Sequence, residues 1–98
     1  MSQTVHVVFP CKEGQGATLL ETLKTALVDT RAFDGCESIE MFTDADNPDN
    51  LILWEQFETR AHHEAYFAWR IETGLPDMLA PILAGDLQIT YLNDHPDV

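Results

Sequence analysis

The chain has 98 residues, enough for one compact domain and too few for two. Seventeen acidic residues against five basic ones give a formal net charge of -12, which repels nucleic acid and anionic membrane surfaces. The sequence has no recognisable signal peptide and no apolar run long enough to span a membrane. We therefore expect a soluble cytoplasmic protein that binds neither nucleic acid nor membranes, with one domain over residues 1–98 and a polar tail at 93–98.

The first predicted elements are a strand and a helix. Val5, Val7 and Phe9 recur at every second position, which indicates a strand, and His6 lies on its other face. Over residues 17–33, leucines recur at intervals of three and four with no helix breaker, which predicts an amphipathic helix. A glycine two residues further on is placed to close this helix.

Two further strands should form a hairpin. The segment 36–43 alternates as a strand does, and 51–57 is a strongly apolar run. Between them, residues 44–50 are Asp, Ala, Asn and Pro, most of which favour turns. The run 51–57 is apolar on both faces, with Leu51, Leu53 and Phe57 on one and Ile52 and Trp54 on the other.

The remaining elements are a helix, a helical turn and a last strand. Thr59 is a candidate N-cap for a helix over 60–72. Residues 77–85 predict a short helical turn interrupted by proline, and residues 87–92 alternate as a strand does. The order β-α-β-β-α-β predicts a ferredoxin-like α+β fold, in which helices cover one face of an antiparallel sheet. Because 51–57 is apolar on both faces, the second face also needs a cover. We predict a homodimer in which two sheets pack face to face.

Three segments of the sequence carry a family resemblance: residues 31–36 (RAFDGC), 46–48 (DNP) and 53–62 (LWEQFETRAH). They are similar to the pattern of the antibiotic biosynthesis monooxygenase family, which has Gly-Cys opening the second strand, an Asn-Pro hairpin, then Glu-x-Trp-x-Ser and a helix bearing histidine. The resemblance extends in element order over residues 3–92 and implies a dimeric α+β barrel. Members of the family include cofactor-free oxygenases of quinols and polycyclic phenols, and haem-degrading enzymes.

The resemblance implies two catalytic residues on the third strand. The cofactor-free oxygenases look as though they use an Asn and a Trp four residues apart, and Asn50 and Trp54 have that spacing. Residues i and i+4 of a strand share a face about 13 Å apart, so the two side chains would line opposite ends of one pocket. Asn50 would hydrogen-bond a phenolate oxygen, and Trp54 would form a flat apolar wall. The alternative is that Asn50 caps the hairpin and Trp54 belongs to the core.

The helix over 60–72 supplies the candidates for proton transfer. The family's helix histidine falls on Tyr66, whose unperturbed pKa of about 10 makes it a poor base at neutral pH. His63 is the candidate proton relay at a pocket rim, with packing against the sheet as the alternative. Neighbours on a helix diverge by about 100°, so His62 and His63 do not make a metal site. An axial histidine of the haem-degrading relatives falls on Pro76, so we expect no haem.

Three more residues are candidates for binding the substrate. His6 would accept a phenol proton if its strand face lined the pocket, and the alternative is a core or interface histidine. Trp69 is a candidate ring contact, with packing as the alternative. Arg70 is a candidate partner for an acidic group of the substrate, with Glu55 or Glu72 as the alternative partners.

The resemblance as a whole implies a cofactor-independent monooxygenase acting on a quinol or polycyclic phenol. Its catalytic residues would be Asn50, Trp54, His63 and Tyr66, and we expect no cofactor and no metal. The alternative is a non-catalytic dimeric barrel that binds a small hydrophobic molecule. Tyr66 at the family's histidine position favours the alternative, while the spacing of Asn50 and Trp54 favours the enzyme.

Overall fold

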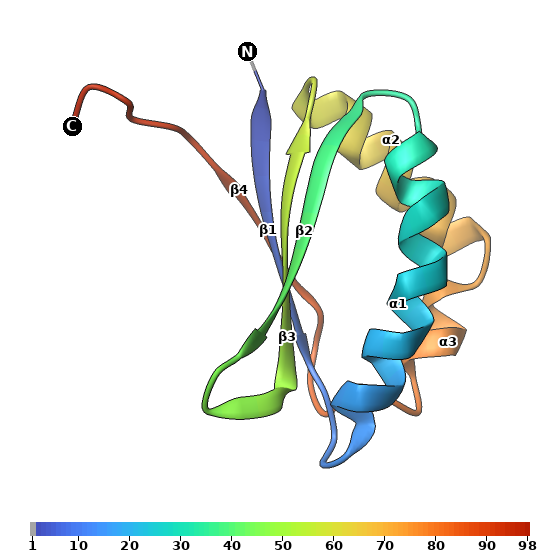
Figure 1. Ribbon diagram of the computed structural model, residues 1–98. Coiled ribbons are helices and arrows are strands. Elements are labelled where there is room, and N and C mark those ends of the chain that lie inside the picture. The colour runs from blue at the N-terminus through green and yellow to red at the C-terminus, as the bar shows by residue number, and fades with distance from the viewer. Residues whose placement is uncertain (1) are drawn as a thin grey trace.

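The computed structural model describes residues 2–98, in which one antiparallel sheet carries helices on one face (Figure 1). The elements in chain order are β1 (Gln3–Pro10), α1 (Gln15–Ala32), β2 (Cys36–Asp44), β3 (Asn47–Phe57), α2 (Arg60–Glu72), α3 (Leu75–Leu79) and β4 (Gln88–Leu92). The strands lie in the order β2-β3-β1-β4. The predicted ferredoxin-like α+β arrangement is confirmed, and α3 is a short addition before the last strand.

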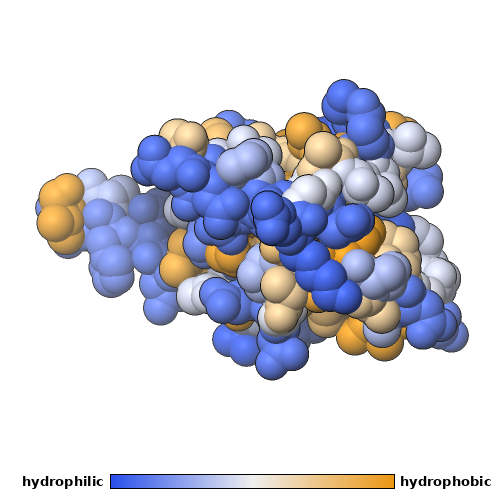
Figure 2. Space-filling model, turned by 90° about the horizontal axis from the view of Figure 1, so that it is seen from below, coloured by the Kyte–Doolittle hydropathy of each residue, from blue (hydrophilic) through white to orange (hydrophobic). Residues whose placement is uncertain are grey.

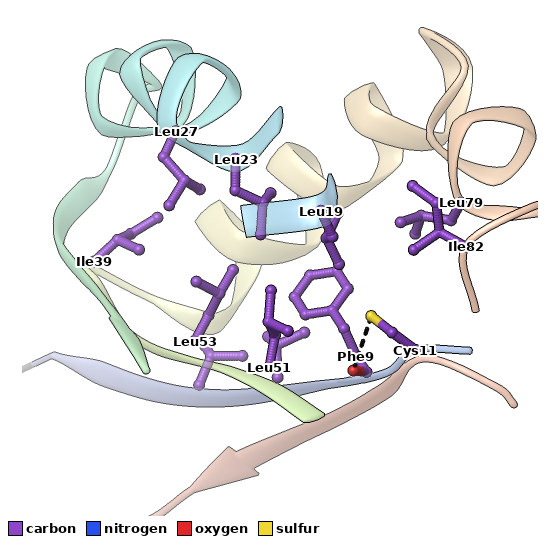
Figure 3. Packing of buried hydrophobic residues seen from close by; sticks show 12 residues of the cluster. Phe9, Cys11, Leu19, Leu23, Leu27, Ile39, Leu51, Leu53, Leu79 and Ile82 are labelled. Carbon is purple, nitrogen blue, oxygen red and sulfur yellow. Dashed lines mark hydrogen bonds between the residues drawn. The ribbon is translucent and has the colours of Figure 1, made fainter. Parts of the chain in front are cut away.

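Strand alternation determines which side chains lie beneath the helices. Six apolar side chains of the two central strands face them and are at most 5% exposed: Val5, Val7, Phe9, Leu51, Leu53 and Phe57. Three leucines of α1, spaced four residues apart, point onto this face: Leu19, Leu23 and Leu27 (Figure 3). The core therefore lies between the sheet and the helices.

The hairpin between β2 and β3 is tighter than predicted. Only Ala45 and Asp46 form the turn, and β3 already begins at Asn47. The register shifts here, because Thr43 pairs with Leu51 whereas the next residue of β2 pairs with Asn47. Residues 47–50, which were predicted to belong to the loop over 44–50, thus form the first part of β3 and contain a bulge.

This bulge also caps the first helix, which explains why α1 begins two residues before its predicted start. The Asp49 carboxylate accepts hydrogen bonds from the backbone N–H of Gly14 (3.1 Å) and of Gly16 (2.9 Å), two donors at the start of the helix. A Cβ atom at Gly16 would lie 2.3 Å from the carbonyl oxygen of Pro48. Only glycine permits so close an approach of the helix to the hairpin.

The second helix agrees with the prediction at both ends. Thr59 is its N-cap, and the Thr59 hydroxyl accepts a hydrogen bond from the backbone N–H of His62 at 3.2 Å. The predicted turn at 77–85 lies too late, because α3 begins at Leu75 and carries Pro76 in its first turn, where proline is favourable. Gly74, at φ 106°, makes the sharp turn between the two helices.

The opposite face of the sheet is uncovered by any helix of residues 2–98 (Figure 1). Phe42 and Trp54 lie on it and are 50% and 39% exposed. The end of the molecule seen in Figure 2 is mostly hydrophilic, with hydrophobic atoms in scattered patches. The open sheet face therefore carries an apolar strip of Val8, Ile52, Phe42 and Trp54 among polar side chains such as Gln56.

Candidate functional site

A small cavity of about 50 Å³ lies between the sheet and the helices. Val7 and Phe9 of β1, Leu53 of β3 and Leu23 of α1 contribute to its apolar lining. Four polar side chains also line it: Glu55, His63, Tyr66 and Arg70. Three of these come from α2, where spacings of three, four and seven residues place side chains on one helix face.

Glu55 and His63 form a buried polar pair at this cavity. Glu55 is 2% exposed and His63 1% exposed, and Glu55 Oε1 lies 3.2 Å from His63 Nε2. The same carboxylate oxygen has no hydrogen-bond partner within residues 2–98. The two groups are therefore at ion-pair distance without a directed hydrogen bond, and the carboxylate can still accept a donor. A buried carboxylate in this condition costs free energy, which is typical of a group kept for chemistry.

Tyr91 extends this pair toward the surface. Val5 of β1 pairs with Glu55 of β3 on one side and with Tyr91 of β4 on the other. Adjacent strands are about 4.8 Å apart, so the backbones at Glu55 and Tyr91 are about 10 Å apart. His63 bridges them from α2, with its Nδ1 atom 2.8 Å from the Tyr91 hydroxyl oxygen. Burial raises the pKa of Tyr91, and the Arg60 guanidinium lies 4.1 Å above its ring. The half-buried phenol thus connects the buried imidazole with the outside.

Tyr66 and Arg70 form a second polar group with Thr30, which is fully buried at the end of α1. Arg70 Nε donates to the Tyr66 hydroxyl at 2.9 Å, and an Arg70 terminal nitrogen donates to Thr30 Oγ1 at 2.6 Å. The Tyr66 and Thr30 hydroxyls are 2.8 Å apart. Burial raises the pKa of Tyr66, although its hydrogen bonds with Thr30 and Arg70 act in the opposite direction.

The predicted carboxylate partners of Arg70, Glu55 and Glu72, are wrong. No acidic side chain in the described part of the chain forms an ion pair with Arg70. Its guanidinium instead contacts Tyr66, Thr30 and the carbonyl oxygen of Ala26. A cation at the cavity without a carboxylate favours an anionic or partly negative oxygen as ligand.

Trp69 supports this group without lining the cavity. Its ring centroid lies 5.4 Å from that of Phe33, and the Arg70 guanidinium lies 4.7 Å from its centroid. The packing alternative considered for Trp69 thus fits its position. Phe67, by contrast, lines the cavity, with its ring nearly parallel to the His63 imidazole at 6.2 Å.

The predicted site is divided by the sheet. Asn50 pairs with Pro10 and Trp54 with His6, on the face away from the helices. The His6 and Trp54 rings meet edge to face at 5.9 Å, and Asn50 Nδ2 lies 3.5 Å from the Asp44 carboxylate in the hairpin. These three residues therefore share a face with one another but no pocket with the α2 residues.

Tyr91 and Thr30 were not predicted from the sequence, and Glu55 was considered only as a partner of Arg70, although the sequence held part of the signal. Glu55 occupies an inward position in the alternation of β3, between Leu53 and Phe57, where a charged residue is unexpected. Tyr91 shares the inward face with Ile89. Thr30 gave no comparable signal.

His62 lies apart from His63, as predicted. Its Nδ1 atom is 2.6 Å from the Thr59 hydroxyl, and its Nε2 atom is 3.9 Å from the Asp34 carboxylate. Within residues 2–98, no three His, Cys, Asp or Glu side chains are grouped so as to hold a metal ion. No helix in that range has both the length and the apolar character needed to cross a bilayer.

Solved structures share this fold over nearly the whole chain. The Rv0793 protein of Mycobacterium tuberculosis has a TM-score of 0.82 and 21% identity, over 97% of this chain and 96% of that one. A conserved protein of Methanosarcina mazei has a TM-score of 0.84 and 14% identity, over 97% and 94% of the two chains. A candidate antibiotic biosynthesis monooxygenase of Deinococcus radiodurans has a TM-score of 0.80 and 20% identity, over 98% and 95%. Identities this low show the fold alone.

A family model identifies the class more closely. The model described as antibiotic biosynthesis monooxygenase matches residues 2–69, and the chain belongs to this family. The family resemblance found in the sequence is thereby confirmed. A search of curated proteins finds no match.

Proposed function

We propose that this chain is a cofactor-independent monooxygenase of a quinol or related phenol, acting in the cavity between the sheet and the helices. The observation that carries the proposal is the convergence of Glu55, His63, Tyr66 and Arg70 on one partly enclosed, otherwise apolar cavity. Acid–base groups, a cation without a carboxylate partner and apolar surroundings are what deprotonation of a phenol and its reaction with dioxygen require. The family membership supports the same class of reaction.

In this proposal the Glu55–His63 pair is the base. A substrate hydroxyl donates to the unpaired Glu55 oxygen, and its proton passes through His63 to Tyr91 and then to solvent, along contacts of 3.2 Å and 2.8 Å. General base catalysis of this kind contributes about 10²–10⁴-fold in rate. Tyr66 is held as a hydrogen-bond donor, because burial raises its pKa.

Arg70 stabilises the negative charge that follows. Electron transfer from the phenolate to dioxygen places charge on oxygen, and a guanidinium beside an apolar cavity stabilises it more strongly than one in water. For a hydroquinone, the balanced reaction gives a hydroxyquinone and water. One oxygen atom enters the ring, the other leaves as water, and the substrate supplies all four electrons. No external reductant is therefore needed.

The open sheet face supports a homodimer as the second part of the proposal. Trp54 and Phe42 are exposed on it. Ile52 and Val8 are half-buried on the same face, where Ile52 pairs with Phe42 on one side and with Val8 on the other. Covering them with the same face of a second chain would remove this apolar area from water. In that arrangement Trp54 and His6 serve the interface, and Asn50 braces the hairpin beside it.

The proposal is tested by oxygen uptake with purified protein and a panel of substituted hydroquinones, with no flavin or metal added. The expected result is uptake above the buffer rate, and with ¹⁸O₂ one labelled atom in the hydroxyquinone product. A quinone product without label would mean simple oxidation and contradict the proposal. No uptake with any hydroquinone that binds in the cavity would favour a non-catalytic barrel binding a small hydrophobic molecule.

A further inference from the structure

A second hollow adjoins the cavity on the outside of the helices. It has a volume of about 250 Å³ and is open to solvent. Phe67 and Ile71 of α2 form one side, Leu75 and Leu79 of α3 another, and Leu83 and Leu87 the third. All its lining residues are apolar, and we call it the outer groove. The outer groove exists because Gly74 turns the chain sharply, so that α3 folds back beside α2.

The outer groove adjoins the cavity, and the two share one wall. Phe67, Leu75 and Leu87 line both, so these three side chains are the partition between them. Phe67 also lies parallel to the His63 ring, which places the partition directly beside the proposed base. A molecule that extends past Phe67 would have one end at Glu55 and His63 and the other end in the outer groove.

We propose that the outer groove binds an aliphatic side chain of the substrate, whose phenolic end enters the cavity. The phenolic end rests on the function proposed above, and the aliphatic end rests on the outer groove itself. A cavity of about 50 Å³ is far below the 300–1,000 Å³ typical of pockets that enclose a whole ligand, so most of the substrate must lie outside it.

The chemistry of the lining selects the aliphatic class. No hydrogen-bonding side chain lines the outer groove, so a sugar, a peptide backbone or an anionic group would lose its hydration there without compensation. Ile71 is 49% exposed at its edge, and an alkyl chain would cover that side chain. A hydroquinone with an alkyl or isoprenoid substituent has the required polarity at both ends.

The test measures binding by calorimetry, using methylhydroquinone and a series with lengthening alkyl chains, under anaerobic conditions. Each methylene that enters the outer groove should tighten binding about threefold to fourfold, and the gain should stop once the chain outgrows the groove. Ala80 lines the outer groove, and Ala80→Phe should remove the gain from chain length. Ala17 is exposed on α1 outside the outer groove, so Ala17→Phe is the matched control and should keep the gain.

Affinity independent of chain length, or an unchanged gain in Ala80→Phe, would overturn the proposal. A change of oligomeric mass in Ala80→Phe would also overturn it, since a second copy of the chain would then occupy the outer groove. The two proposals fail separately. If binding depends on chain length but no oxygen is taken up under aerobic conditions, the proposal for the outer groove stands and the monooxygenase proposal fails. If oxygen is taken up but KM does not depend on chain length, the monooxygenase proposal stands and the proposal for the outer groove fails.

Discussion

At the scale of single residues, the cavity combines a carboxylate and a guanidinium that do not neutralise each other. Glu55 lies 3.2 Å from His63, and Arg70 is held by Tyr66 and Thr30. A buried carboxylate oxygen without a hydrogen bond and a half-buried guanidinium without a carboxylate partner both cost stability. Residues kept at such a cost are typical of sites that act on a ligand, where stability is exchanged for activity.

This cost leads to a prediction for Glu55. Glu55→Met together with His63→Leu replaces both members of the buried pair by apolar side chains, so the free energy of unfolding should stay unchanged or rise by about 1 kcal/mol. Urea unfolding followed by circular dichroism measures it. A loss of several kcal/mol would mean that Glu55 is a structural residue and that its pairing with His63 holds the fold together.

The buried phenol of Tyr66 gives a prediction for alkaline pH. Its pKa is raised in the folded protein, chiefly by burial, whereas in the unfolded chain it titrates near 10. The unfolded chain therefore loses this proton first, and stability falls as the pH rises from about 10 through the folded-state value. Above pH 10 the wild-type protein should lose stability more steeply than Tyr66→Phe. Absorbance at 295 nm showing that Tyr66 ionises at or below pH 10 in the folded protein would contradict this.

At the scale of elements, the hairpin and the first helix depend on each other through Asp49. Its carboxylate accepts from the backbone N–H groups of Gly14 and Gly16, and the helix N-cap supplies no side-chain hydrogen bond of its own. In α1 the N-terminal N–H groups are thus capped by Asp49, which is distant in sequence, whereas in α2 they are capped by the local residue Thr59.

Asp49→Ala should therefore cost about 1 kcal/mol in the free energy of unfolding, as the loss of a helix cap does. Asp46→Ala is the control, because Asp46 is exposed in the turn and its side chain makes no hydrogen bond within residues 2–98. Chemical denaturation of both variants compares them. Equal stability of the two would show that the contact between Asp49 and the helix is dispensable.

The same elements show what the sequence can reveal. The bounds of α2 were predictable, because the Thr59 cap and the helical periodicity are local signals. The bulge at the start of β3 was not, because it depends on Asp49 reaching α1 across 33 residues. The shared helix face of His63, Tyr66 and Arg70 was also predictable, because these residues are three and four positions apart. Asn50 and Trp54 have the family spacing, yet a strand apolar on both faces does not reveal which face the helices cover.

At the scale of the whole molecule, the sheet has one face beneath helices and one open face with an apolar strip around Trp54. If the open face is a dimer interface, Trp54→Asp should give a folded monomer, because a charge there opposes association and leaves the core intact. Leu53→Asp is the comparison, and it should unfold the chain, since Leu53 is 4% exposed beneath the helices. Light scattering with circular dichroism distinguishes these outcomes. A wild-type mass near the chain mass of 11.1 kDa would exclude the dimer.

The most direct test of the account asks which face of the sheet carries the chemistry. Oxygen uptake with an alkylated hydroquinone should be measured for the wild-type protein, Glu55→Gln and Asn50→Ala, each verified as folded. The account predicts that Glu55→Gln loses about 100-fold or more in kcat, as removal of a general base does, while Asn50→Ala loses little. The opposite pattern, with Asn50→Ala inactive and Glu55→Gln near the wild-type rate, would contradict the assignment of the site to the cavity beneath the helices.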